Sequence, residues 1–236
     1  MREYSPKGQA THERILSVSK KLFCSKGYRG TTYTDICGEC KINPGTIFHH
    51  FKTKKNIAAT IYNKLLETFY LRTEALFPGE DDFQQVILAH GMHHKTAYYF
   101  PEYRRFATEY ANDATEADDG MPDGLDKPKK VVIEALGPEE GSFFIAVYAG
   151  MSGVIESYVD KHIDNLTFRE SFDYMCRIYY SRIGGDDLPE RIDRAYEDLC
   201  KIDIQFEQLD IIIDRAATGK AAPPDRVTLD GHDTDL

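Results

Sequence analysis

The stretch TYTDICGECKINPGTIFHHFKTK, residues 32–54, predicts two short helices joined by a tight turn. Thr32 and Asp35 have the spacing of a capping box, in which each side chain satisfies a backbone N–H at the start of a helix. Ile36 and Cys40 lie four residues apart and therefore share one helical face. We expect that face to be buried.

A second helix is predicted after the turn. Asn43 is a favourable N-cap, and Pro44 suits the first helical position because its missing N–H costs nothing there. Ile47 and Phe51, four residues apart, can anchor this helix in a core. The outward face is polar and aromatic and carries Thr46, Phe48, His49 and His50. This arrangement predicts a helix-turn-helix, which reads base edges of duplex DNA.

The charge distribution supports binding to nucleic acid. Residues 1–55 contain eleven Lys and Arg against four Asp and Glu, a net charge of +7. Residues 56–236 contain 18 basic and 35 acidic side chains, a net charge of −17. A basic segment attracts phosphates and releases counterions, whereas an acidic body discourages non-specific adherence to DNA. Taken alone, the basic segment is equally well explained as a solvated helix surface.

The two helices are part of a longer pattern. Its residues are Ile15, Leu16 and Leu22-Phe23, then Gly27-Tyr28, Gly30-Thr31-Thr32, Asp35-Ile36, Gly45-Thr46-Ile47-Phe48, His50-Phe51 and Lys54. The segment from Arg14 to Leu65 thereby resembles the DNA-binding domain of TetR-type transcriptional repressors. The resemblance implies an all-α fold, with a small N-terminal three-helix DNA-binding domain and a larger helical domain that binds a small molecule and forms a homodimer. It also implies a regulator released from a palindromic double-stranded DNA operator by its effector, rather than an enzyme.

The resemblance also predicts which residues contact DNA. They are Thr32, Tyr33, Thr34, Asn43, Gly45, Thr46, Phe48, His49, His50, Lys52 and Lys54. Two positions depart from the family pattern. Lys41 stands in the turn where Gly is common, and a positive φ there would cost about 1 kcal/mol. Phe48 stands where Tyr is usual, so a hydroxyl is absent and apolar contact, for example with a thymine methyl group, remains.

We predict three regions along the chain: a DNA-binding domain with its N-terminal arm over residues 1–55, a helical effector-binding and dimerisation domain over 56–217, and a disordered tail over 218–236. The arm, residues 1–9, is expected to lack structure, either frayed or lying in a minor groove. Apolar periodicity predicts a long helix that ends before Pro78-Gly79. Further helices are expected over 82–99, 101–114, 127–136, 168–183 and 188–217, with a loop over 115–124.

The segment 138–162 is apolar and rich in small residues. Together with 168–183 it predicts a pair of helices that pack against their symmetry copies in a dimer. The alternative is a core helix within one chain.

Aromatic residues crowd the expected helices 82–99 and 101–114, which favours a cavity for a planar or lipophilic effector. The predicted effector-binding residues are His94, Tyr98, Tyr99, Tyr103, Phe106, Tyr110, Phe144, Tyr148 and Met151. A solid aromatic core without a cavity explains each of them equally well.

Other functional classes receive less support. Cys37 and Cys40 form a C-x-x-C inside a predicted helix, where buried packing is favoured over thiol sensing. No His has a Glu three residues before it, so the spacing typical of a di-iron bundle enzyme is missing. We therefore expect no cofactor and no metal, although His90, His93 and His94 share a helical face. Without a long apolar run or a signal sequence, a cytoplasmic protein without membrane contact is expected. An activator and an effector-independent DNA-binding protein remain alternatives.

Overall fold

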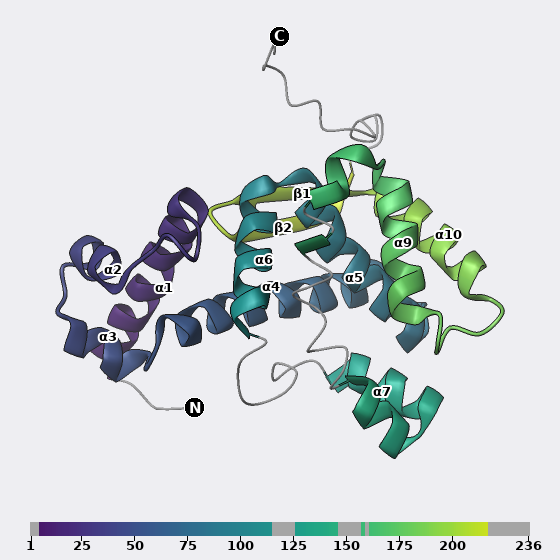
Figure 1. The fold of residues 1–236 in the computed structure, drawn as a ribbon, viewed down its shortest axis with the longest axis horizontal. Helices are drawn as coiled ribbons and strands as arrows, with labels where there is room; N and C mark the ends of the chain where they lie inside the picture. Colours follow the sequence, from purple (N-terminus) through teal and green to yellow (C-terminus); the bar gives the residue numbers. More distant parts are fainter. Residues whose placement is uncertain (1–4, 115–125, 146–156, 159–160, 217–236) are drawn as a thin grey trace, which may run out of the picture.

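The N-terminal helices pack around a shared core in a computed structural model, which describes residues 5–114, 126–145, 157–158 and 161–216 (Figure 1). Helix α1 spans Pro6–Lys26, α2 spans Tyr33–Cys40 and α3 spans Pro44–His50. The predicted anchors Ile36, Ile47 and Phe51 are all buried. The helix-turn-helix is therefore confirmed as a structural unit, together with the all-α class of the N-terminal part.

Helix α1 begins earlier than predicted. The expectation that residues 1–9 lack structure is wrong from Pro6 onward, while residues 1–4 lie outside the described part. Ser5 is the N-cap, and its hydroxyl accepts the N–H of Gly8 at 3.3 Å. Pro6 occupies the first helical position, where its fixed φ suits a helix. The Ser-Pro pair was the signal that the prediction overlooked.

The C-terminal body is built around α5, which spans Asp82–Tyr99, the range predicted for this helix. The long helix α4, Lys54–Leu76, precedes α5 in the sequence, and α6, Pro101–Ala114, follows it. Helices α7, Asp126–Leu136, α9, Phe168–Tyr180, and α10, Leu188–Cys200, also contact α5. A short 3₁₀ turn spans Ile163–Asn165, and residues 138–145 are helical. The fold is thus predominantly helical, as expected.

Two features hold α5 against α10. A Cβ at Gly91 would lie 2.4 Å from Cδ1 of Leu199, so a larger residue there would force the Leu199 side chain or the two helices to shift. The buried ammonium of Lys95 donates to the backbone carbonyls of Leu199 and Ile202, at 2.8 and 2.9 Å. The carbonyl of Leu199 lies in the last turn of α10, and that of Ile202 lies just beyond its end. A cation at this position also interacts favourably with the negative end of the helix dipole.

The predicted helix 188–217 is wrong after Cys200. Strand β1, Ile202–Glu207, pairs with β2, Asp210–Arg215, in an antiparallel hairpin. Gln208 and Leu209 form its two-residue turn, with φ of 52° and 62°. Positive φ at both central residues suits the right-handed twist of the strands, although Asn-Gly is the usual sequence there. Because Asn-Gly is absent here, the turn was not recognised from the sequence.

The hairpin connects the C-terminal body to the N-terminal helices. Asp210 at its tip pairs with Lys20 of α1, and Leu209 is fully buried. Along β2, Asp214 accepts from Arg72 of α4 at 2.6 Å, and Arg215 donates to the carbonyl of Leu76 at 2.8 Å. Figure 1 shows the hairpin, in yellow, extending from the body to the side of α1. The hairpin therefore contacts both α1 and α4.

Several predictions fall on residues outside the described part. These are the loop 115–124, the middle of segment 138–162 and the tail 218–236. The proposed boundary between residues 55 and 56 stays a prediction, and α4 crosses it without interruption. Within the described ranges, no helix is long and apolar enough to cross a membrane.

Candidate DNA-binding interface

The start of α2 is fixed by the predicted capping box. The Thr32 hydroxyl accepts the N–H of Asp35 at 3.2 Å, and the Asp35 carboxylate accepts the N–H of Thr32 at 2.8 Å. Lys26 of α1 also donates to Asp35, at 2.5 Å. This bond, with those from Thr32, holds the pKa of Asp35 below its usual range. The carboxylate therefore stays ionised and joins α1 to α2.

Helix α3 is held at both ends and along one face. Asn43 accepts the N–H of Thr46 at 2.9 Å, and Pro44 is the first helical residue, as predicted. Ile47 is buried beneath the helix, while the ring of Phe51 stacks on His12 of α1, with centroids 4.4 Å apart. The orientation of α3 on α1 is therefore set by contacts on its inner side.

The opposite face of α3 is exposed. Phe48 exposes 67% of its surface, so its ring is available for an apolar contact with a partner. Tyr33, at the start of α2, is 39% exposed. The other predicted DNA-contacting residues are solvent-accessible to different degrees: Thr32, Thr34, Asn43, Gly45, His49 and Lys52 are exposed, whereas Thr46, His50 and Lys54 are partly buried. Their contact with DNA stays a prediction.

Lys41 adopts the left-handed conformation expected from the position of a family glycine. Its φ and ψ are 52° and 47°, and its N–H donates to the carbonyls of Cys37 and Gly38 at the end of α2. The turn therefore keeps the geometry that glycine would give it. The cost is about 1 kcal/mol of backbone strain.

Lys54 is engaged with the protein itself. Its ammonium donates to the carbonyls of Tyr28 and Thr31, at 2.8 and 2.9 Å, and lies 4.3 Å from the centre of the Tyr28 ring. Burial lowers the pKa of Lys54. The residue thus fastens the start of α4 to the turn between α1 and α2. Its predicted contact with a phosphate stays a prediction.

Both cysteines of the C-x-x-C are free thiols inside this small core. Cys37 is 9% exposed and Cys40 is 1% exposed. Burial raises the pKa of Cys40, which disfavours the reactive thiolate. The geometry supports the interpretation of these residues as packing side chains.

Residues 15–61 match a family described as "Bacterial regulatory proteins, tetR family". The N-terminal domain of this chain is a tetR-family domain. Its matched range runs from the buried part of α1 through the helix-turn-helix into α4.

Part of the chain also matches curated relatives that are named transcriptional regulators. The transcriptional regulator UidR of Escherichia coli K12 is 36% identical over 53 residues, which are 22% of this chain and 27% of the relative. QacR of Staphylococcus aureus is 39% identical over 51 residues, 22% of this chain and 27% of the relative. TcmR of Streptomyces glaucescens is 30% identical over 74 residues, 31% of this chain and 33% of the relative. The chain therefore matches about a quarter to a third of each relative's length.

Among solved structures, a tetR-family transcriptional regulator from Pectobacterium atrosepticum aligns with 84% of this chain and 94% of its own. The sequence identity is 15% and the TM-score is 0.46.

Behind the tetR-family domain, the predicted effector residues are mostly core. Tyr103 and Phe106 are fully buried, and Tyr98 donates its hydroxyl to the carbonyl of Leu166 at 2.8 Å. His94, Tyr99 and Tyr110 are likewise packed among aromatic rings. Tyr148 and Met151 lie outside the described residues. The described side chains are thus part of the aromatic core, and their contact with an effector stays a prediction.

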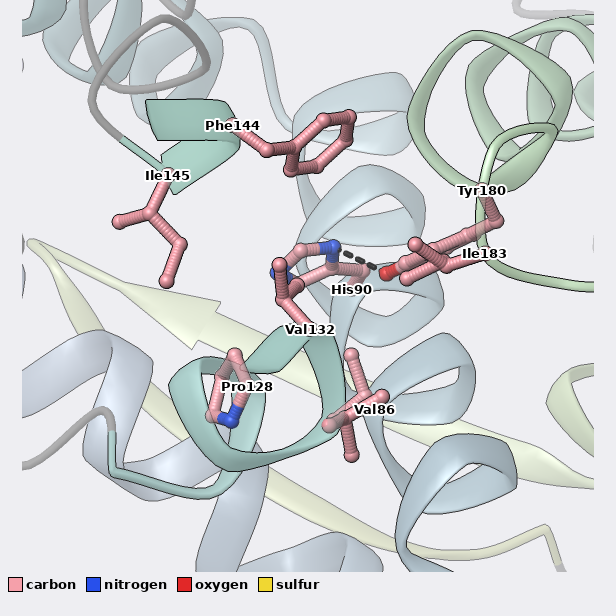
Figure 2. A pocket seen from close by; sticks show the side chains of 9 residues that line it. Val86, His90, Pro128, Val132, Phe144, Ile145, Tyr180 and Ile183 are labelled. Carbon is pink, nitrogen blue, oxygen red and sulfur yellow. Dashed lines mark hydrogen bonds between the residues drawn. The ribbon is translucent and has the colours of Figure 1, made fainter. Parts of the chain in front are cut away.

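A described pocket lies elsewhere, between α5, α7, residues 144–145 and the end of α9 (Figure 2). Its empty space is about 370 Å³ when the solvent at its open side is counted, and the part closed off from solvent has room for little more than a water molecule. Among the predicted effector residues that the structure describes, Phe144 is the one that lines it. The prediction missed His90 and Tyr180, which meet there through a hydrogen bond. The many aromatic residues in these helices indicated that the region is buried. Burial alone does not distinguish a packed core from a cavity.

The three histidines of α5 have separate partners. His90 contacts Tyr180, while His93 lies 3.2 Å from the Tyr62 hydroxyl and His94 lies 2.9 Å from the Ser171 hydroxyl. Burial lowers the pKa of all three, to about 4, 3 and 4 respectively. The described residues include no group of three His, Cys, Asp or Glu placed to hold a metal ion.

Proposed function

We propose that the chain is a ligand-responsive transcriptional regulator that binds a palindromic DNA operator as a homodimer. In its favoured form it is a repressor that a small lipophilic effector releases from DNA. The observation that carries the proposal is the exposed apolar and polar face of α3, centred on Phe48, within a tetR-family domain. A helix that is packed on its inner side and exposed on its opposite face can enter a major groove.

Contacts between the two parts of the chain support a response to a ligand. Glu109 of α6 accepts the N–H of Arg29 at 2.8 Å, in the turn between α1 and α2. Tyr28 of the same turn pairs with Asp113. A shift of α6 would therefore move the loop that leads into the helix-turn-helix. Such a connection is what a ligand needs in order to change the affinity for DNA.

The outer face of α9 supports the homodimer. Phe172, Cys176 and the rest of the inner face are buried, whereas Tyr174 and Ile178 on the other side are 57% and 58% exposed. Exposed apolar side chains four residues apart on a helix suit packing against a second copy. Two copies would also present two recognition helices to the two halves of a palindrome.

Fluorescence anisotropy with the labelled duplex upstream of the protein's own gene tests the proposal. We expect saturable binding that a scrambled duplex does not compete for, and that weakens steeply with salt as counterions are released. Light scattering should give a mass of twice 26.9 kDa. Absence of binding at low salt would refute the DNA-binding function, and a monomer that binds with full affinity would refute the dimer.

A reporter gene placed behind the same DNA decides between repression and activation. Deletion of the regulator should raise expression of the reporter, and a panel of lipophilic metabolites added to the intact strain should reproduce that rise. Lower expression after deletion would instead identify an activator.

A further inference from the structure

Three of the eight histidines in the chain lie together where α1 meets the end of α3. His49 and His50 are the last two residues of α3, and their rings meet nearly at right angles with centroids 5.4 Å apart. The ring of His12, from α1, lies 5.8 Å from that of His50 and stacks on Phe51. His49 is exposed, whereas His50 and His12 are partly buried. These three rings, the imidazole cluster, therefore reach from the packed side of α3 to its exposed face.

Little negative charge faces the imidazole cluster. The titratable groups that act on His12 are Glu13 of α1, His50 of α3 and Lys64 of α4. Those that act on His50 are His49 and His12. Among the described residues, Glu13 is thus the one carboxylate that acts on either of these two rings. A positive charge on the cluster consequently has little to offset it in the free protein.

The two partly buried rings are therefore held in the neutral form. Burial, followed by repulsion from His50 and Lys64, lowers the pKa of His12 below its ordinary value of 6.5. Burial and the neighbouring His49 lower the pKa of His50 in the same direction. At physiological pH each of the two rings is mostly uncharged. Negative charge brought close to the cluster would reverse these shifts.

Duplex DNA carries such charge. The proposed function places the exposed face of α3 in a major groove, whose edges are lined by phosphates. An opposite charge within about 4–6 Å favours the charged form of a group and shifts its pKa by about 1–3. Because the three rings are neighbours, the first imidazolium disfavours a second, so the cluster takes up about one proton and shares it.

The other histidines leave few competing explanations for such a proton. Burial holds the pKa values of His90, His93 and His94 at about 4, 3 and 4, so these residues stay neutral between about pH 6 and about pH 8. His162 is exposed in the C-terminal body, and His232 lies outside the described residues. His162 therefore provides a control that titrates without belonging to the cluster.

We propose that operator binding is coupled to the uptake of about one proton per protomer by the imidazole cluster, so that the affinity for DNA rises as the pH falls. The resulting imidazolium interacts with phosphate oxygens of the duplex. His12, which lies on α1 outside the predicted DNA-contacting residues, contributes by sharing the proton with His50. The inference rests on the proposed function and deepens it, because it adds a residue and a proton to the DNA-binding reaction.

Anisotropy titrations of the full chain with the duplex upstream of its own gene test the coupling. The salt concentration is held constant while the pH is changed from about 8 to about 6. Uptake of one proton changes the affinity about tenfold per pH unit between the pKa of the complex and that of the free protein, so we expect at least about a tenfold rise over this range. Calorimetry in two buffers of different ionisation enthalpy counts the protons directly.

Variants locate the proton in the cluster. His12→Phe keeps a ring that can stack on Phe51 but cannot titrate, and His50→Gln keeps a polar side chain without a charge. The double variant should reduce the slope of log affinity against pH by at least about half, whatever its absolute affinity. His162→Gln should leave the slope unchanged. Urea unfolding of each variant verifies that the fold is retained.

Nuclear magnetic resonance of histidine-labelled protein gives the pKa values themselves. We expect the signals of His12 and His50 to titrate below 6.5 in the free protein and at higher pH in the DNA complex. Free pKa values at or above 6.5 would overturn the inference without any DNA. Equal affinity at both ends of the pH range, a proton count near zero, or a full slope in the double variant would also overturn it. Operator binding without pH dependence refutes this inference alone, whereas absence of binding at every pH and low salt refutes the proposed function.

Discussion

Replacing Phe48 by alanine should weaken operator binding without weakening the fold. The side chain is 67% exposed, so little of its surface is buried in the free protein. A phenylalanine presents about 200 Å² of surface, and the exposed part is therefore roughly 130 Å². At about 25 cal/mol per Å², complete burial of this area against DNA contributes roughly 3 kcal/mol.

A groove covers only part of such a ring, so we expect Phe48→Ala to lower affinity by about 10- to 100-fold. Because an apolar contact releases no counterions, the slope of log affinity against log salt should stay the same. Lys52→Ala offers the opposite signature, since loss of a phosphate contact would reduce that slope by about one.

Anisotropy titrations at several salt concentrations and urea unfolding of the same samples provide the assay. Leu71→Ala is the matched control, because Leu71 is 57% exposed on α4, outside the helix-turn-helix. Unchanged affinity in Phe48→Ala would refute the reasoning. So would an equal loss in Leu71→Ala, or a fall in the free energy of unfolding that accounts for the weaker binding.

Four further predictions address affinity and stability. Phe48→Tyr restores a hydroxyl on the exposed face and should keep or tighten operator affinity, and a clear loss in a mobility-shift titration at fixed salt would contradict this. Lys41→Gly relieves a positive φ of 52° and should raise the free energy of unfolding by about 1 kcal/mol, whereas Lys41→Ala should not. Lys95→Met removes the ammonium that donates to the buried carbonyls of Leu199 and Ile202 and should cost about 2–4 kcal/mol in urea unfolding; a change below about 0.5 kcal/mol would show that water replaces the ammonium. The three histidines of α5 have folded pKa values of about 4, 3 and 4, below the unfolded value of 6.5. Their contribution to stability is therefore fully present above pH 6.5 and is lost as the pH falls from 6.5 toward the folded pKa values. Unfolding at about pH 7.5 and about pH 5.5 should differ by roughly 4 kcal/mol, and equal values would contradict the neutral buried state.

The helix-turn-helix was predictable from sequence because local chemistry determines it. Caps at Thr32 and Asn43 and the proline at position 44 act within three or four residues, so no knowledge of the distant chain is required. The same rules, applied to Ser5 and Pro6, would have placed the start of α1 correctly.

The hairpin was missed because the spacing of its apolar residues fits both the period of a helix and the alternation of a strand. Ile202, Phe206 and Ile213 fit a helical face, but Ile202, Ile204 and Phe206 also alternate with polar residues as in a strand. Packing decides between these patterns: Phe206 contacts Phe100 and Tyr103, from α6 and the residue before it. The pocket was missed for a similar reason, since it depends on the space left between helices rather than on the residues of any one of them.

The hairpin also determines when folding of the molecule can be completed during synthesis of the chain. Lys20 and Asp210 are 190 residues apart in the chain, among the most distant partners in the described structure. The first helix leaves the ribosome long before its partner exists, so a nascent chain can form the three N-terminal helices while the contact to the hairpin is still missing. A product that stops before Ile202 would keep the helix-turn-helix but lack this connection to the body. Premature termination would thus release the N-terminal helices without the hairpin that joins α1 and α4.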